Sequence, residues 1–168
     1  RDGDILLSAD DKPLTRFDVD MLRAVAEAHV IKVNRGGLET EIFMPEVSLL
    51  DIAKDNPPFV EPLMPNVVDS VIVGMPFDKA GLQKGDSLLA VNGKTVGSWN
   101  TFLYEMAALQ ADAEAEGKGN AALDIVYSRN GLRDTVSLQT DSLYKVGVLK
   151  NALSYKQTRL SYGFFESF

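Results

Sequence analysis

An internal repeat limits the fold of this 168-residue chain more than any other feature of its sequence. Residues 3–7 correspond to residues 85–89 at an offset of 82, and residues 10–14 correspond to 92–96 at the same offset. Further along, residues 31–38 correspond to 125–132 at an offset of 94. The 12 additional residues of the second copy lie around 111–120, where Ala, Glu, Gly and Lys predict a surface loop or a helix extension.

Both copies carry the same order of local signals. A short apolar run ends in Asp10-Asp11 or in Asn92-Gly93, which predicts a strand, a tight turn and a short strand. A helix with one buried stripe is expected next, followed by a hairpin. The expected N-caps are Thr15 and Ser98. The stripe comprises Phe17, Met21 or Leu22, and Val25 in the first copy, and Trp99, Phe102 or Leu103, and Met106 in the second.

Only the second copy is preceded by a further segment, so the first copy is expected to be truncated at its front. Prolines at 58, 62 and 65 restrict a predicted strand over 59–64 to a sheet edge. A second strand is expected over 69–73, and a short helical turn closed by Gly81 over 76–82. The chain is therefore assigned to the α+β class, mostly β.

The run VGMPFDKAGLQKGDSLLAVNGK, residues 73–94, resembles the PDZ domain of bacterial proteases, whose pattern is roughly S-P-A-x-x-A-G-L-x-x-G-D-x-I-x-x-v-n-G. This sequence departs from the pattern at Met75-Pro76-Phe77 and at Leu88. Gly81, Gly85 and Gly93 lie where tight turns are expected to need a positive φ.

Two such modules in tandem resemble the periplasmic region of bacterial site-2 membrane zinc metalloproteases, the regulator of sigma-E protease family. The resemblance implies tandem PDZ-like modules, each a small, partly open β-barrel or sandwich with helices. Residues 1–50 would be the truncated first module and 51–150 the second, and 151–168 an aromatic tail before a membrane helix. It also implies a parent in the inner membrane, with this region on the periplasmic side. The parent's substrate would be a peptide or a single-span membrane protein such as an anti-sigma factor.

The sequence lacks the combinations of side chains that nucleophilic catalysis or zinc binding requires. The chain has no cysteine, and its one histidine, His29, cannot supply the two histidines of a His-Glu-x-x-His zinc motif. A Ser-His-Asp triad is not expected either, because the candidate serines have no histidine within a plausible triad. Asp10-Asp11 and the pair Asp51 and Asp55 are interpreted as turn or surface residues. We expect no catalytic residue and no metal in this chain, and zinc only in the suspected parent.

The net charge of the chain bears on the class of molecule that it could bind. Lys and Arg number 17 against 24 Asp and Glu, a net charge of −7 that disfavours nucleic acid. No apolar stretch approaches the roughly 20 residues of a spanning helix, so the membrane would be reached through spans of the parent. The tail has aromatic residues around Lys156 and Arg159, typical of a membrane-interface anchor or of packing onto the second module. Self-association is expected through the open sheet edge of the first copy.

The remaining functional feature is a peptide groove. In PDZ modules a peptide adds as a strand to a sheet edge beside a helix. By resemblance, the peptide-binding residues would be Phe59, Val60, Glu61, Pro62, Leu63, Phe102 and Met106. The alternative for Phe102 and Met106 is an ordinary core position. Alternatives for the chain as a whole are a stand-alone peptide-binding adaptor and the PDZ region of a periplasmic serine protease of the HtrA type.

Overall fold

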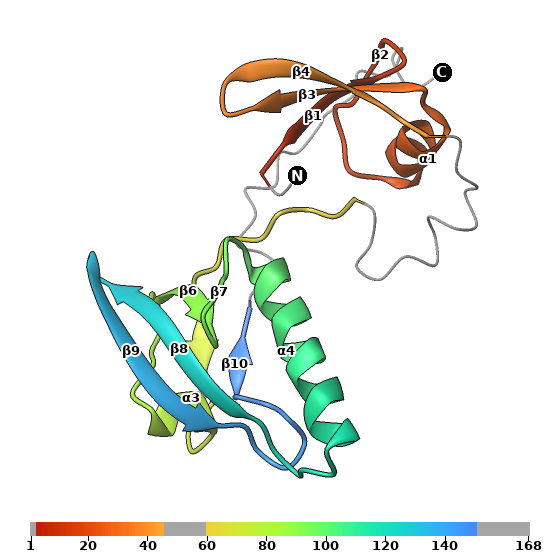
Figure 1. The fold of residues 1–168 in the computed structure, drawn as a ribbon. Coiled ribbons are helices and arrows are strands. Elements are labelled where there is room, and N and C mark those ends of the chain that lie inside the picture. Colours follow the sequence, from red (N-terminus) through yellow and green to blue (C-terminus); the bar gives the residue numbers. More distant parts are fainter. Residues whose placement is uncertain (1–2, 46–59, 151–168) are drawn as a thin grey trace, which may run out of the picture. The chain divides into compact units, whose positions relative to one another are not determined.

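The computed structural model describes residues 3–45 and 60–150 (Figure 1). The chain divides into two compact units, residues 1–66 with 95–108 and residues 67–94 with 109–168. Each unit contains one antiparallel four-stranded sheet with the same strand order. The predicted tail over 151–168, Phe59, Asp51 and Asp55 lie outside the described residues.

The first sheet has the order β2-β1-β3-β4. Its strands are β1 (Ile5–Ala9), β2 (Lys12–Pro13), β3 (Val30–Arg35) and β4 (Leu38–Phe43), and the helix α1 (Val19–Glu27) lies between β2 and β3 in the chain. Met21 and Val25 of α1 are buried in one core cluster with Ile31 and Val33 of β3. The predicted hairpin and helix are therefore confirmed.

Two details of the first copy were predicted wrongly. The N-cap of α1 is Asp18, whose side chain accepts a hydrogen bond from the backbone N–H of Met21 at 2.9 Å, and not Thr15. Phe17 precedes the helix and is 51% exposed, so it is not part of the buried stripe. The chain turns into the helix three residues later than Thr15, and Phe17 therefore never acquires helical spacing to Met21.

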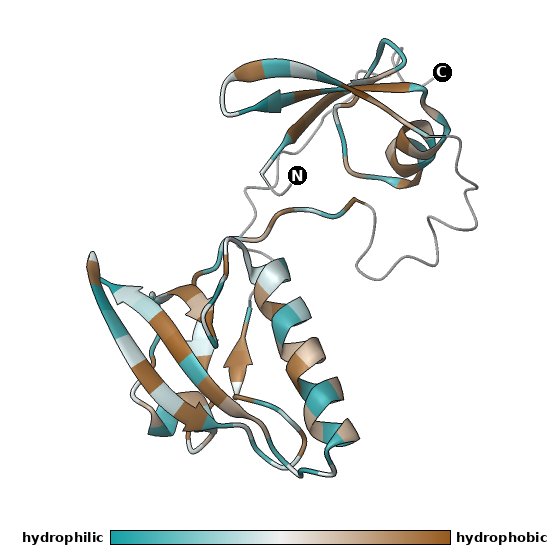
Figure 2. Cartoon of the chain, in the orientation of Figure 1, coloured by the Kyte–Doolittle hydropathy of each residue, from teal (hydrophilic) through white to brown (hydrophobic). Residues whose placement is uncertain are grey.

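The second sheet repeats the first. Its order is β7-β6-β8-β9, with β6 (Ser87–Val91), β7 (Lys94–Thr95), β8 (Ala122–Arg129) and β9 (Leu132–Gln139). Buried residues alternate with more exposed ones along β8, and Figure 2 shows that this strand carries both hydrophobic and hydrophilic residues. Even the irregularity is repeated, because the register shifts between Leu6 and Ser8 in one sheet and between Leu88 and Ala90 in the other.

A two-stranded ribbon belongs to the second unit. It pairs β5 (Ser70–Val71) with β10 (Val148–Leu149), and the one-turn helix α3 (Pro76–Lys79) follows β5. The predicted strand over 69–73 is thus confirmed in shortened form, and so is the helical turn. Gly81, Gly85 and Gly93 have φ values of +79°, +93° and +80°, as their turns were predicted to need.

The helix α4 (Trp99–Ala115) begins after Ser98, whose Oγ accepts a hydrogen bond from the backbone N–H of Thr101 at 3.0 Å. Ser98 is therefore the N-cap that the sequence predicted. The helix continues into the additional residues of the second copy, which form a helix extension and then a loop. Within the described residues, no helix combines the length and apolar character needed to cross a membrane.

Candidate functional site: a ribbon edge and the polar contacts around it

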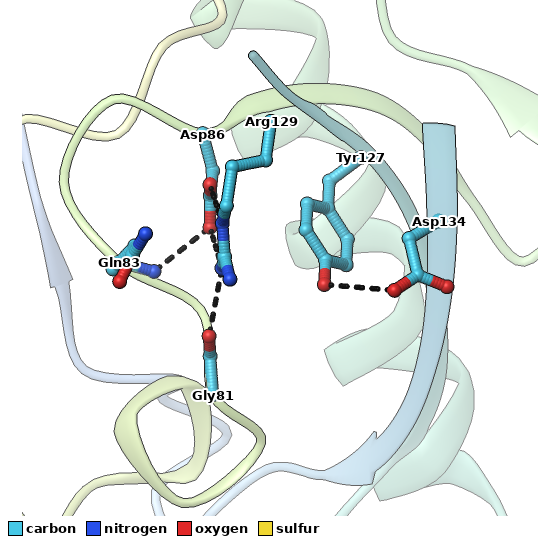
Figure 3. A network of polar contacts seen from close by, with 6 residues as sticks. All are labelled: Gly81, Gln83, Asp86, Tyr127, Arg129 and Asp134. Carbon is cyan, nitrogen blue, oxygen red and sulfur yellow. Dashed lines mark hydrogen bonds and ion pairs between the residues drawn. The ribbon is translucent and has the colours of Figure 1, made fainter. Parts of the chain in front are cut away.

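A buried ion pair fixes the glycine-rich turn of the second unit. Asp86 is fully buried and accepts two hydrogen bonds from Arg129, from Nε at 2.7 Å and from Nη2 at 2.8 Å (Figure 3). The same carboxylate accepts the backbone N–H of Gln83, and Arg129 also donates to the carbonyl of Gly81. The pair therefore joins the end of β8 to the loop that follows α3.

The electrostatics of this pair favour the ionised carboxylate. Burial raises the pKa of Asp86, but the hydrogen bonds from Arg129 and Gln83 outweigh burial, and the pKa lies below its ordinary value. The Arg129 guanidinium lies 5.2 Å from the centre of the Tyr127 ring, and burial raises the pKa of that phenol. Tyr127 donates in turn to Asp134. These contacts join β8, β9 and the loop that follows α3.

This arrangement predicts a pH dependence of stability. Because the folded-state pKa of Asp86 is lowered, its contribution is complete above the unfolded value of about 4 and is lost as pH falls toward the folded value. The stability difference between the wild type and Asp86→Asn is expected to shrink between pH 7 and pH 3, measured by urea unfolding at each pH. A difference that stays constant over this range would contradict the role assigned to the carboxylate.

The first unit contains the equivalent pair. Arg35 donates to Asp4 from Nε at 2.8 Å and from Nη2 at 2.6 Å, and its hydrogen bonds hold the pKa of Asp4 well below the usual range. Asp4 precedes Asp86 by the first repeat offset, and Arg35 precedes Arg129 by the second. The repeat therefore held the signal for both pairs, although the sequence analysis did not identify them.

The turns that follow β1 and β6 are stabilised by equivalent side-chain hydrogen bonds. Asp10 Oδ1 accepts the backbone N–H of Val30 at 2.9 Å, and Asn92 Oδ1 accepts that of Asp124 at 2.7 Å. Asp10 also accepts the backbone N–H of His29, and these backbone hydrogen bonds lower its pKa. Asp10 is therefore a turn residue, as predicted, and the exposed His29 ring lies against it at 3.2 Å.

The predicted peptide-binding segment lies against the start of α4. The Pro62 carbonyl accepts a hydrogen bond from Asn100 Nδ2 at 3.2 Å. The Met64 N–H donates to Asn100 Oδ1, and the Met64 carbonyl accepts the Trp99 N–H, each at 2.8 Å. Tyr104 donates to the carboxylate of Glu61. Residues 60–64 form no strand, which corrects the expectation of an edge strand there, because the backbone of this segment is bonded to a helix.

Side-chain burial differs among the predicted residues. Pro62 and Leu63 are exposed, and Val60 is half-buried. Phe102 is 1% exposed and its ring centre lies 5.1 Å from that of Trp99, so it is a core residue. Met106 is half-buried on the same helix. Peptide contact by these residues remains a prediction.

A strand edge that the sequence analysis missed lies at β10. Residues 67–72 form hydrogen bonds on one side with the turn before β6. The Val68 N–H donates to the Asp86 carbonyl, and the Val68 carbonyl accepts the Gly85 N–H. The same run carries β5, which pairs with β10. Within residues 3–45 and 60–150 no further strand pairs with β10, which leaves it outermost in this arrangement.

The start of β10 is tightly packed. Gly147 has a φ of +76°, and a Cβ built on it would lie 2.1 Å from Met75 Cβ, too close for any side chain. The carbonyl of Gly147 accepts the Ile72 N–H, and that of Val146 accepts the Phe77 N–H. Glycine at this position therefore allows β10 to approach α3 and β5.

We expect Gly147→Ala to displace β10. The left-handed backbone alone costs about 1–3 kcal/mol with a side chain present, and the overlap with Met75 adds to it. Gly131→Ala is the matched control, because Gly131 has a φ of +82° with no atom within 4 Å of the added Cβ. Amide hydrogen exchange of β10 should accelerate in the first variant only. Equal exchange in both would show that the close approach is unimportant.

The described residues do not fit a zinc site. They bring together no group of three or more His, Cys, Asp or Glu side chains that could hold a metal ion. His29 is accompanied by Asp10, which already caps the backbone. Zinc prefers nitrogen and sulfur ligands, which this chain barely offers.

Comparisons with known proteins support the fold described above. Residues 67–111 match the model of a PDZ domain family. Over 109 residues the chain is 28% identical to a protein of Lactococcus lactis subsp. lactis (strain IL1403) named "Putative zinc metalloprotease"; the alignment covers 63% of this chain and 23% of that protein. The α+β, mostly β fold and the predicted resemblance are confirmed. Residues 67–111 thus match a PDZ domain, within a sequence similar to that of a protein named as a zinc metalloprotease.

Proposed function

We propose that this chain is the PDZ region of a membrane-embedded zinc endopeptidase of the site-2 type, and that it recognises or gates the substrate on the extracytoplasmic side. The parent would cut the membrane span of an anti-sigma factor or a similar single-span protein. The observation that carries the proposal is the PDZ match over 67–111 in a chain aligned with a metalloprotease relative. The chain spans about a quarter of that relative, so catalysis would belong to other segments.

The contribution of this chain would be peptide binding. PDZ modules take a peptide as an added strand, with main-chain hydrogen bonds supplying affinity. The β9 edge carries Arg133 and Asp134, and charged residues on an edge discourage strand addition. The β5–β10 ribbon consists of Ser70, Val71, Val148 and Leu149 and carries no charge of its own. We therefore place the added strand at β10.

The gene around this region tests the proposal directly. It should encode apolar spans, with a His-Glu-x-x-His motif before this region and a Leu-Asp-Gly segment after it. Those motifs supply zinc ligands and a general base that the present residues lack. A trypsin-like domain upstream would instead support a serine protease of the HtrA type, and a gene without a protease domain would support a stand-alone adaptor.

Met106→Lys tests whether the face of α4 takes part in substrate choice. Met106 is half-buried, so the variant should fold, but an apolar side chain of a bound peptide would have to cover and desolvate the added ammonium, which costs binding free energy. The full protease carrying Met106→Lys is expected to lose its preference for trimmed substrates, measured by cleavage of trimmed and untrimmed forms. Ala108→Lys, at an exposed position of the same helix, is the control. Unchanged substrate choice by a folded Met106→Lys variant would exclude this face from recognition.

A further inference from the structure

The two strands of the ribbon present distinct faces. Val148 lies opposite Val71, and Leu149 lies opposite Ser70. Successive side chains of a strand point to opposite sides, so Leu149 and Ser70 share a face with Ile72. Val71 and Val148 are half-buried, whereas Leu149 is 54% and Ile72 43% exposed. The face of Leu149, Ser70 and Ile72 is called the outer face below.

The outer face combines two exposed apolar side chains with one serine and carries no charged residue of its own. The residue opposite Leu149 is the small Ser70, so Leu149 has no large cross-strand neighbour on β5. The next charged residue, Lys150, is only 8% exposed and is held by Asp69 at 3.3 Å and by the Val67 carbonyl at 3.0 Å. Its charge is therefore neutralised on the β5 side and does not extend over the outer face.

We propose that Leu149 makes β10 select peptides whose added strand carries apolar side chains on both faces, the outer face and the opposite face on which Val71 and Val148 lie. This inference rests on the proposed addition of a peptide strand at β10. A strand paired with β10 would place alternate side chains directly beside Leu149, and apolar cross-strand pairs stabilise a sheet. A polar side chain in that position would leave the exposed leucine in water and gain no such contact. Leu149 is then a specificity-determining residue.

The test uses the whole chain and two synthetic peptides. One peptide alternates Val with Ser and is apolar on one face, and the other alternates Val with Leu and is apolar on both; each carries two lysines at its N-terminus for solubility. Binding is followed by the backbone amide signals of β5 and β10 in NMR titrations. Leu149→Ser removes the outer apolar side chain, and Leu143→Ser removes a 65% exposed leucine elsewhere in the same unit.

The two-faced peptide is expected to bind the wild type about two- to fivefold more tightly than the one-faced peptide. This advantage should disappear in Leu149→Ser and persist in Leu143→Ser. If both peptides shift the β10 amides but the advantage survives in Leu149→Ser, selection by Leu149 is overturned while strand addition stands. If neither peptide shifts those amides, strand addition at β10 is overturned and the selectivity falls with it.

Discussion

Replacing Phe102 by alanine is expected to lower the free energy of unfolding by about 3–5 kcal/mol, the range for removing a large aromatic side chain from a core. The ring is almost fully buried and packs on Trp99, so its loss leaves a cavity beside the start of α4. Urea unfolding followed by the fluorescence of Trp99, the single tryptophan, measures the change.

Leu103→Ala is the control for this prediction. Leu103 is the next residue of α4 and is 46% exposed, so its truncation should change the stability far less. Similar losses in the two variants would mean that the packing around Phe102 is not what stabilises this helix. A stable Phe102→Ala variant with altered peptide binding would return Phe102 to the predicted groove.

Asp86→Ala is expected to cost about 1–3 kcal/mol, because it removes a buried carboxylate that accepts hydrogen bonds from Arg129 and from the Gln83 N–H. The substitution leaves Arg129 with the Gly81 carbonyl and the Tyr127 ring, and it leaves the Gln83 N–H without its acceptor. Thermal unfolding measured by circular dichroism tests this. Asp134→Ala alters an exposed carboxylate of the same network and should have little effect. A tolerated Asp86→Ala would contradict the structural role of the pair.

The internal repeat made much of the fold predictable. Hairpins, tight turns and glycines with positive φ follow from local signals that appear twice, so each copy supports the reading of the other. The N-cap of α1 was missed because both Thr15 and Asp18 are suitable residues, and the choice depends on where the backbone turns. The strand expected near Pro62 failed because Asn100 of α4 binds the backbone there.

The ribbon edge was less accessible to sequence reasoning. β10 has two residues, and its partner β5 lies near the other end of the second copy. Only tertiary contacts, such as those between Gly147 and Ile72, bring the two together. The ion pairs could have been predicted, because Asp4 and Asp86, like Arg35 and Arg129, occupy corresponding repeat positions.

The addition of a peptide strand at β10 is tested by amide hydrogen exchange of the whole chain, measured with and without the alternating Val/Leu peptide. Exchange of the β10 amides should slow when the peptide is present, because an added strand would form hydrogen bonds with the side of β10 that faces away from β5. Unchanged exchange at β10 at saturating peptide, or protection confined to residues 60–64 and α4, would contradict it.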